Sequence, residues 1–175
     1  MIDSWYEANM IMYADKLEDV VWYNEKDFTT GAFAGGLGNI PSFYAGYDRI
    51  LNKKLPQYKY VNKNDMFTVS GEIGNGALTY PVGTITVDEL AYAGLSFASS
   101  YNSSFLKSNS MWWTMTPSDL SYNSPSYICV SSNNLLKTER IQSSLDVRPM
   151  VSLKHGVLYS DGDGTVNNPY VIEVN

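Results

Sequence analysis

This chain of 175 residues is long enough to bury the core of one domain and too short to predict two. Its composition, 44% hydrophobic and 17% charged, is typical of a globular protein. The net charge of −6 argues against a nucleic-acid partner, which needs clustered Lys and Arg against the phosphates. No apolar run approaches about 18 residues, so we expect no membrane span in this chain.

Two helices are predicted in the first hundred residues. The first begins at Ser4, because Ser4 and Glu7 have the spacing of a capping box, and its apolar stripe runs to about residues 17–19. The second begins at Thr86, which forms another capping box with Glu89, and spans about two turns.

The segment between these helices is predicted to be mostly irregular. Residues 29–47 are rich in glycine and form a long loop, where binding sites are often found. Residues 46–65 carry most of the positive charge of the first half and are interpreted as surface, with Pro56 ending any helix. Residues 66–83 are predicted to form two short strands around a turn at 74–76.

Strands are predicted from residue 100 onward, separated by turns rich in Ser, Asn, Gly and Asp. The first strand, at 110–118, is expected to end at Pro117, which has no backbone N–H to donate. The other predicted strands are 125–132, 135–141, 146–153 and 168–174. The predicted fold class is therefore α+β, with two early helices packed on a mainly antiparallel sheet and with long irregular loops.

Aromatic residues are unusually frequent, with 14 Tyr, 4 Trp and 6 Phe. These residues favour strands, so one interpretation is that they cover sheet faces. Tyrosine also joins a large apolar ring to a hydroxyl group, which suits a recognition surface. The composition leaves both interpretations open.

Trp112 and Trp113 are neighbours on a predicted strand, so their rings are expected to point to opposite sides of the sheet. An outward tryptophan beside Tyr122, Asn123 and Tyr127 would form a surface on which a sugar or a peptide stacks. The favoured interpretation buries both rings, one in the core and one beneath the glycine-rich loop.

Arg148 is interpreted as a buried arginine, held extended by Pro149, whose planar guanidinium binds a carboxylate or loop carbonyls. An anion-binding role is the alternative.

The closing stretch "SDGDGT" contains Asp161 and Asp163, which are candidates for a calcium loop or for a tight turn. A calcium loop of the EF-hand type requires a bidentate glutamate at its end, and the next acidic residue, Glu173, falls within a predicted strand. The turn is favoured, with both aspartates bonding their own backbone.

No catalytic constellation is evident, and no cofactor is expected. Cys129 is the only cysteine and His155 the only histidine, which excludes a disulfide within the chain and a zinc site. A Cys129–His155 pair is an alternative, but burial of the cysteine in a strand is favoured.

Three segments together resemble a family of surface proteins of Gram-positive bacteria. They are "LTYPVGTITVDELAYAG" (78–94), "WWTMTPS" (112–118) and "DVRPMVSLKHGVLYSDGDGTVNNPYVIEV" (146–174). Members of that family often follow a prepilin-like or other membrane segment, which implies export. The resemblance therefore implies that residues 1–175 are a single domain, the soluble C-terminal part of a longer protein tethered to the membrane through a segment absent from this chain. The family usually has Gly where this chain has Asp146.

The tryptophan strand and the "VRP" strand also show a looser similarity to the C-type-lectin-like fold of formylglycine-generating-enzyme-like domains. Enzymes of that type need reactive cysteines, and Cys129 stands alone, so their activity is not carried over.

The expected function is non-enzymatic, as an extracellular or cell-surface domain of a pilin-like protein used for adhesion, ligand binding or assembly. Its expected partners are a glycan, a host or matrix protein, or like subunits. One alternative is an enzyme of unknown type whose cleft lies between the 29–47 loop and the Trp112–Trp113 strand. Another is a structural subunit whose aromatic faces meet neighbouring copies.

Overall fold

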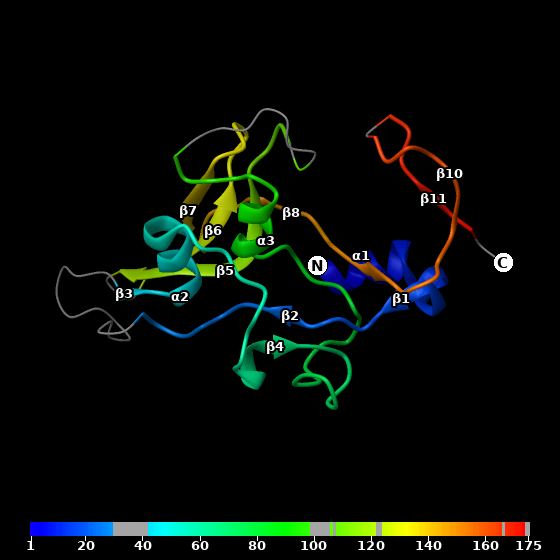
Figure 1. The fold of residues 1–175 in the computed structure, drawn as a ribbon, viewed down its shortest axis with the longest axis horizontal. Coiled ribbons are helices and arrows are strands. Elements are labelled where there is room, and N and C mark those ends of the chain that lie inside the picture. Colours follow the sequence, from blue (N-terminus) through cyan, green and yellow to red (C-terminus); the bar gives the residue numbers. More distant parts are fainter. Residues whose placement is uncertain (30–41, 99–105, 107, 122–123, 166, 174–175) are drawn as a thin grey trace.

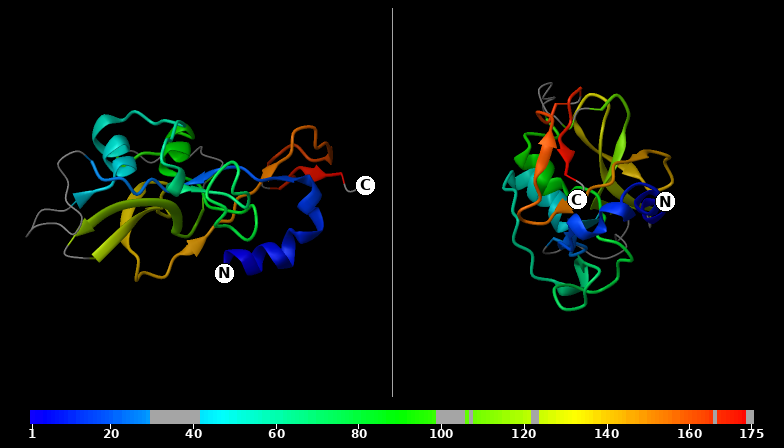
Figure 2. Two further views of the ribbon diagram at one scale, coloured as in Figure 1. Left: turned by 90° about the horizontal axis from the view of Figure 1, so that it is seen from below. Right: turned by 90° about the vertical axis from the view of Figure 1, so that its right-hand side faces the viewer.

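A five-stranded sheet covered by short helices lies toward one end of the molecule, and a two-stranded hairpin extends from the other end (Figures 1 and 2). The computed structural model describes residues 1–29, 42–98, 106, 108–121, 124–165 and 167–173. Within these residues the chain combines helices with mainly antiparallel strands, which confirms the predicted α+β class. Each helix of this described part is too short or too polar to cross a membrane.

The five-stranded sheet has the order β3-β5-β6-β7, with β8 beside the start of β5. Its strands are β3 (Ser42–Phe43), β5 (Trp112–Ser121), β6 (Ser124–Val130), β7 (Leu136–Arg140) and β8 (Asp146–Val147). Neighbours are antiparallel except for β8, which pairs with β5 in parallel.

The prediction that Pro117 ends its strand is wrong, because β5 continues through it to Ser121. The pairing of β5 with β6 shifts register between Trp113 and Pro117 and again between Pro117 and Asp119. Such irregularities leave a residue outside the regular ladder, where proline's missing N–H costs little. Pro117 itself pairs with Tyr127, between two irregularities that interrupt the regular ladder on either side of the proline.

Two short helical segments lie over the five-stranded sheet (Figure 1). The first is α2 (Ala45–Asp48), which continues into a π-helical turn, η2 (Arg49–Lys53). The second is α3 (Val87–Tyr92). The predicted capping box of α3 is confirmed, since Thr86 Oγ1 accepts from the Glu89 N–H at 3.3 Å and Glu89 Oε2 accepts from the Thr86 N–H at 2.8 Å.

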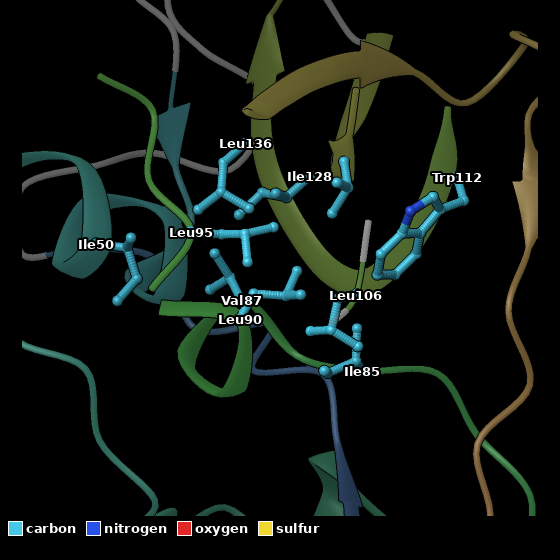
Figure 3. Close-up of a cluster of buried hydrophobic side chains, with 10 residues drawn as sticks. Ile50, Ile85, Val87, Leu90, Leu95, Leu106, Trp112, Ile128 and Leu136 are labelled. Carbon is cyan, nitrogen blue, oxygen red and sulfur yellow. The ribbon is translucent and has the colours of Figure 1, made fainter. Parts of the chain in front are cut away.

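The main core forms where α3 and η2 meet the sheet (Figure 3). Val87 and Leu90 project from α3 and are fully buried, as is Ile128 of β6. The remaining members are Ile50, Ile85, Leu95, Leu106, Trp112, Val130 and Leu136. Burial of such side chains contributes roughly 1.5–3 kcal/mol each, so this cluster is what holds the helices against the sheet.

The first helix differs from its prediction at both ends. α1 (Ile2–Asn9) begins before Ser4 and has no side-chain cap, so the predicted Ser4–Glu7 capping box is wrong. Glu7 Oε1 instead accepts a hydrogen bond from the Tyr80 hydroxyl at 2.8 Å. The chain then tightens into a 3₁₀ helix, η1 (Ile11–Lys16), so the apolar stripe does not continue as one α-helix.

A second, smaller core packs α1 against the chain that follows α1 and the chain before α3. Its buried members are Tyr6, Leu17 and Val82. Leu17 belongs to β1 (Leu17–Glu18), which pairs with β9 (Ser152–Leu153). The first helix thus has its own hydrophobic partners, separate from those of α3.

The remaining strands are short two-stranded pairs. β2 (Trp22–Tyr23) pairs with β4 (Met66–Phe67), and the 3₁₀ turn η3 (Lys63–Asp65) directly precedes β4. Of the two strands predicted in 66–83, the second is reduced to an isolated bridge between Gly83 and Met150.

The C-terminal hairpin pairs β10 (Tyr159–Asp161) with β11 (Val171–Ile172). It lies at the other end of the molecule from the five-stranded sheet (Figure 1 and the left view of Figure 2).

The reactivity of the Cys129 thiol tests whether the sheet is packed as described. The cysteine side chain is fully buried on β6, and burial raises the pKa of the thiol to about 11, with Glu139 adding to the shift. Since the thiolate is the reactive form, we expect iodoacetamide at pH 8 to label the folded protein at least about 100-fold more slowly than the denatured protein. Equal labelling rates in the two states would show that β6 is not packed as described.

Candidate functional site

A buried arginine, Arg49, joins three segments that are distant in the sequence. Its guanidinium binds Asp88 through Nε at 3.0 Å and Nη2 at 2.6 Å, and binds Glu25 through Nη1 at 2.9 Å and Nη2 at 2.6 Å. The three residues are at most 9% exposed. The arginine therefore makes paired hydrogen bonds to two carboxylates at once, the geometry that a planar guanidinium favours. This position lies in the 46–65 segment that was predicted to be surface, and that prediction is wrong here.

The backbone is arranged to bring these charges together. Arg49 begins the π-helical turn, Asp88 lies in the first turn of α3, and Glu25 follows β2 with a left-handed φ of +41°. Gly46 leaves room for the ion pair, because a Cβ atom there would lie 3.0 Å from Glu25 Oε2. Burial alone would lower the pKa of Arg49, but the hydrogen bonds to Glu25 and Asp88 outweigh it and raise that pKa.

Asp88 also anchors the loop that follows η2. Its Oδ1 accepts from the Gln57 N–H at 2.9 Å, and its Oδ2 lies 3.5 Å from the Tyr60 hydroxyl, which donates to the Gln57 carbonyl at 3.1 Å. The ion pair thereby fixes the position of Tyr60 relative to α3.

A pocket of about 310 Å³ opens beside this cluster, and we call it the tyrosine pocket. It is lined by Val21, Trp22, Tyr23, Tyr58, Tyr60, Met66, Thr86 and Glu89. Tyr23 stacks on Tyr60 with ring centroids 3.8 Å apart, and Tyr58 stacks on Tyr92 at 4.3 Å. The pocket is thus lined by a stacked pair made of the buried Tyr23 and the half-buried Tyr60, and by the exposed Tyr58, whose stacking partner Tyr92 lies outside the lining.

Glu89 contributes the carboxylate of the tyrosine pocket. Its Oε2 accepts from the Thr86 N–H and Oγ1, both at 2.8 Å, and thereby caps α3. Within the described residues, Oε1 accepts no hydrogen bond. The half-buried Glu89 therefore keeps one oxygen open to a donor.

The tyrosine hydroxyl groups of the pocket lie in a negative field. Burial raises the pKa of Tyr23 to about 12, and Glu25, Asp65 and Asp27 add to the shift. Burial and then Glu89 raise the pKa of Tyr58, and burial and then Asp88 raise that of Tyr60. All three phenols are therefore neutral at physiological pH.

Two other hollows lack this combination of rings and charge. One, of about 580 Å³, lies between η2 and the segment after α3 and has mainly apolar walls, among them Ile50, Leu95 and Phe97. The other, of about 280 Å³, shares Trp22 with the tyrosine pocket and includes Met115 and Tyr127. The Trp22 Nε1 atom is buried without a hydrogen-bond partner in the described part of the chain.

The predicted tryptophan surface is only partly present among the described residues. Trp112 is 1% exposed and belongs to the main core, whereas Trp113 is half-buried on the opposite face. Tyr127 is half-buried and lines the 280 Å³ hollow rather than the tyrosine pocket. Tyr122 and Asn123 lie outside the described residues, as do residues 30–41 of the glycine-rich loop.

Arg148 packs on the core instead of lining the tyrosine pocket. Its Nη1 donates to the Leu106 carbonyl at 2.6 Å, and its guanidinium lies 4.9 Å from the centre of the Trp112 ring. The predicted bond to a loop carbonyl is present, but Arg148 is half-buried and not buried as expected. The residue anchors the chain after β8 to the segment before β5.

Asp161 and Asp163 form the turn contacts that were predicted for them. Asp161 Oδ1 accepts from the Gly162 N–H at 2.7 Å, and Asp163 Oδ1 accepts from the Thr165 N–H at 2.9 Å. Gly162 and Gly164 have φ of +92° and +80°, angles that suit glycine. The backbone bond from Thr165 lowers the pKa of Asp163.

Reactive or metal-binding clusters are not formed by the described side chains. Cys129 is buried on β6 and His155 is exposed in the turn after β9, so these two residues do not make a catalytic pair. Nowhere in the described ranges do three His, Cys, Asp or Glu residues gather as a metal site.

The residues of the tyrosine pocket were mostly missed by sequence reasoning. Only the Thr86–Glu89 capping box gave a local signal. Arg49 sits among lysines and aspartates in a polar segment, and Tyr23, Tyr58 and Tyr60 come from segments that meet only after folding. Searches against protein-family models, curated proteins and solved structures found no match to this chain.

Replacement of Arg49 tests the ion pair. Arg49→Met keeps the length of the side chain but leaves Glu25 and Asp88 buried without their cation, so we expect the free energy of unfolding to fall by about 3–5 kcal/mol. Arg140→Met, at an exposed position of β7, is the matched control and is expected to stay within about 0.5 kcal/mol. Chemical denaturation of both variants measures the difference. Equal stability of the two variants would contradict the assigned role of Arg49.

Proposed function

We propose that this chain is a non-enzymatic ligand-binding domain, displayed at the cell surface by a pilin-like or membrane-tethered protein and used for adhesion. The observation that carries the binding function is the tyrosine pocket, which is lined by aromatic rings and in which the Tyr60 hydroxyl lies 3.5 Å from Asp88 of the buried ion pair. Aromatic walls with a few polar groups are typical of recognition sites. The surface location rests on the resemblance to Gram-positive surface proteins, and so does the proposed C-type-lectin-like relationship.

The carboxylates near the pocket favour binding over catalysis. Asp88 and Glu25 are each engaged by Arg49, and Glu89 caps α3. A general acid or base must be free to exchange a proton with its substrate, whereas Asp88 and Glu25 are committed to the ion pair and Glu89 has one of its two oxygens committed to the cap. Of the two tryptophans on the strand of the alternative enzyme cleft, Trp112 is enclosed in the core and Trp113 is half-buried, while residues 30–41 of the loop lie outside the described residues.

Assembly with like subunits is a second candidate, favoured by the C-terminal hairpin. Leu158, Tyr159, Tyr170 and Val171 are all exposed large apolar residues on or next to its strands. An isolated two-stranded hairpin is marginally stable on its own, and a neighbouring copy would cover these side chains. Sedimentation velocity distinguishes the candidates, since assembly through the hairpin predicts concentration-dependent self-association.

Tyr58 and Tyr159 form a matched pair for testing the binding function. Their exposed fractions are 63% and 62%, and each ring contacts another tyrosine. We expect Tyr58→Ala to weaken binding to a glycan or matrix-protein array about tenfold or more, because a stacking ring at a binding site contributes on the order of 1–2 kcal/mol.

Tyr159→Ala is expected to bind to the same array like the parent protein. Loss of binding in Tyr159→Ala but not in Tyr58→Ala would move the site to the hairpin. Absence of any ligand for the parent protein would contradict the proposed function.

A further inference from the structure

The walls of the tyrosine pocket have the chemistry of a cation site. The faces of aromatic rings carry partial negative charge and attract ammonium groups within about 6 Å. Trp22, Tyr23, Tyr58 and Tyr60 all line one pocket of about 310 Å³. Tyr23 and Tyr60 cover one face of each other by stacking, so a cation in this small volume would meet their remaining faces or those of Trp22 and Tyr58.

The charges beside the pocket add to this preference. Arg49 faces two carboxylates, Glu25 and Asp88, so the buried cluster carries one excess negative charge. Glu89 adds a second, and its Oε1 has no hydrogen-bond partner in the described chain. A neutral ligand would leave this field uncompensated, whereas a cation would neutralise it.

The positively charged groups near the pocket do not cancel the negative charge of Glu25, Asp88 and Glu89. Lys26 pairs with Asp65 at 3.9 Å and lies over the Phe67 ring, and neither Lys26 nor Phe67 lines the pocket. In the first turn of α3, the Glu89 N–H donates to the Thr86 hydroxyl and the Val87 N–H donates to the Thr116 hydroxyl. The pocket therefore combines aromatic faces with net negative charge.

We propose that the tyrosine pocket binds the ammonium head of an alkylammonium ligand, either a small amine or the side chain of a lysine in a partner protein. The inference rests on the proposed ligand-binding function and specifies its ligand class. The ammonium group lies among the rings, and its charge faces the open oxygen of Glu89. The volume, near the lower end for ligand sites, suits such a compact head group.

Choline and its uncharged isostere 3,3-dimethyl-1-butanol test the charge requirement, because they differ chiefly in the positive nitrogen. Titrations followed by ligand NMR should show choline binding at least about tenfold more tightly, with its methyl signals moved upfield by the rings. Nα-acetyl-lysine methylamide and its Nε-acetylated form test the lysine source in the same way.

Two pairs of variants assign the binding to this pocket. Glu89→Gln retains a side chain that serves in a capping box, so it removes the charge while keeping α3 capped, and should weaken choline binding about tenfold. Tyr58→Leu should weaken it similarly. Glu173→Gln and Tyr159→Leu change equivalent residues on the C-terminal hairpin and should have no effect.

Each outcome bears on the inference. Binding of either cation, with loss in Glu89→Gln, supports it and identifies the source of the ammonium group. Equal binding of a cation and its neutral isostere overturns it. Binding of a neutral glycan that depends on Tyr58, with no cation bound, also overturns it but leaves the proposed function intact. Failure of every probe and of the arrays overturns both.

Discussion

The structure depends on one buried positive charge. Arg49 has two carboxylate partners that come from positions before and after it in the chain, and without the arginine each would be an uncompensated buried anion. Breaking such a pair is costly because water cannot replace the missing partner. The constraint fixes η2, Glu25 (two residues after β2) and the first turn of α3 relative to one another, and these segments lie around the tyrosine pocket.

The tyrosine pocket follows from that constraint together with the hydrophobic core. α3 is held from one side by Val87 and Leu90, which pack against the sheet, and from the other by Asp88. Asp88 then positions the loop that carries Tyr60. One short helix thus links the apolar core to the aromatic pocket, and a ligand in the pocket would meet side chains that are already ordered. Such preorganisation reduces the entropy lost on binding.

The sequence correctly predicted features that depend on contacts between residues close to one another in the chain. The Thr86–Glu89 capping box and the turn bonds of Asp163 depend on residues close in the chain, and both are present. The α+β class was also predicted correctly from the patterns of single segments, although the strands pair across long distances in the sequence. Ser4 and Glu7 have the same spacing as that capping box, but a tertiary contact with Tyr80 competes for the Glu7 carboxylate.

The errors share a non-local cause. Pro117 was expected to end its strand, but the register shift that accommodates it depends on the pairing with β6. Arg49 was placed on the surface because its segment is polar, and its two partners lie 24 and 39 residues away in the sequence. The aromatic composition was compatible with strands covered by rings and with a recognition surface, and which tyrosines line the tyrosine pocket is decided by the packing of distant segments. Residue types alone could not identify the tyrosines that line this pocket.

A double-mutant cycle on Arg49→Met and Asp88→Asn tests the central claim most directly. The four free energies of unfolding, measured by chemical denaturation, give the energy of interaction between the two side chains. If the buried ion pair organises this region, the two substitutions are expected to be non-additive, with a coupling of about 0.5–3 kcal/mol. Additivity within about 0.3 kcal/mol would contradict the account, because it would mean that the two residues contribute to stability independently.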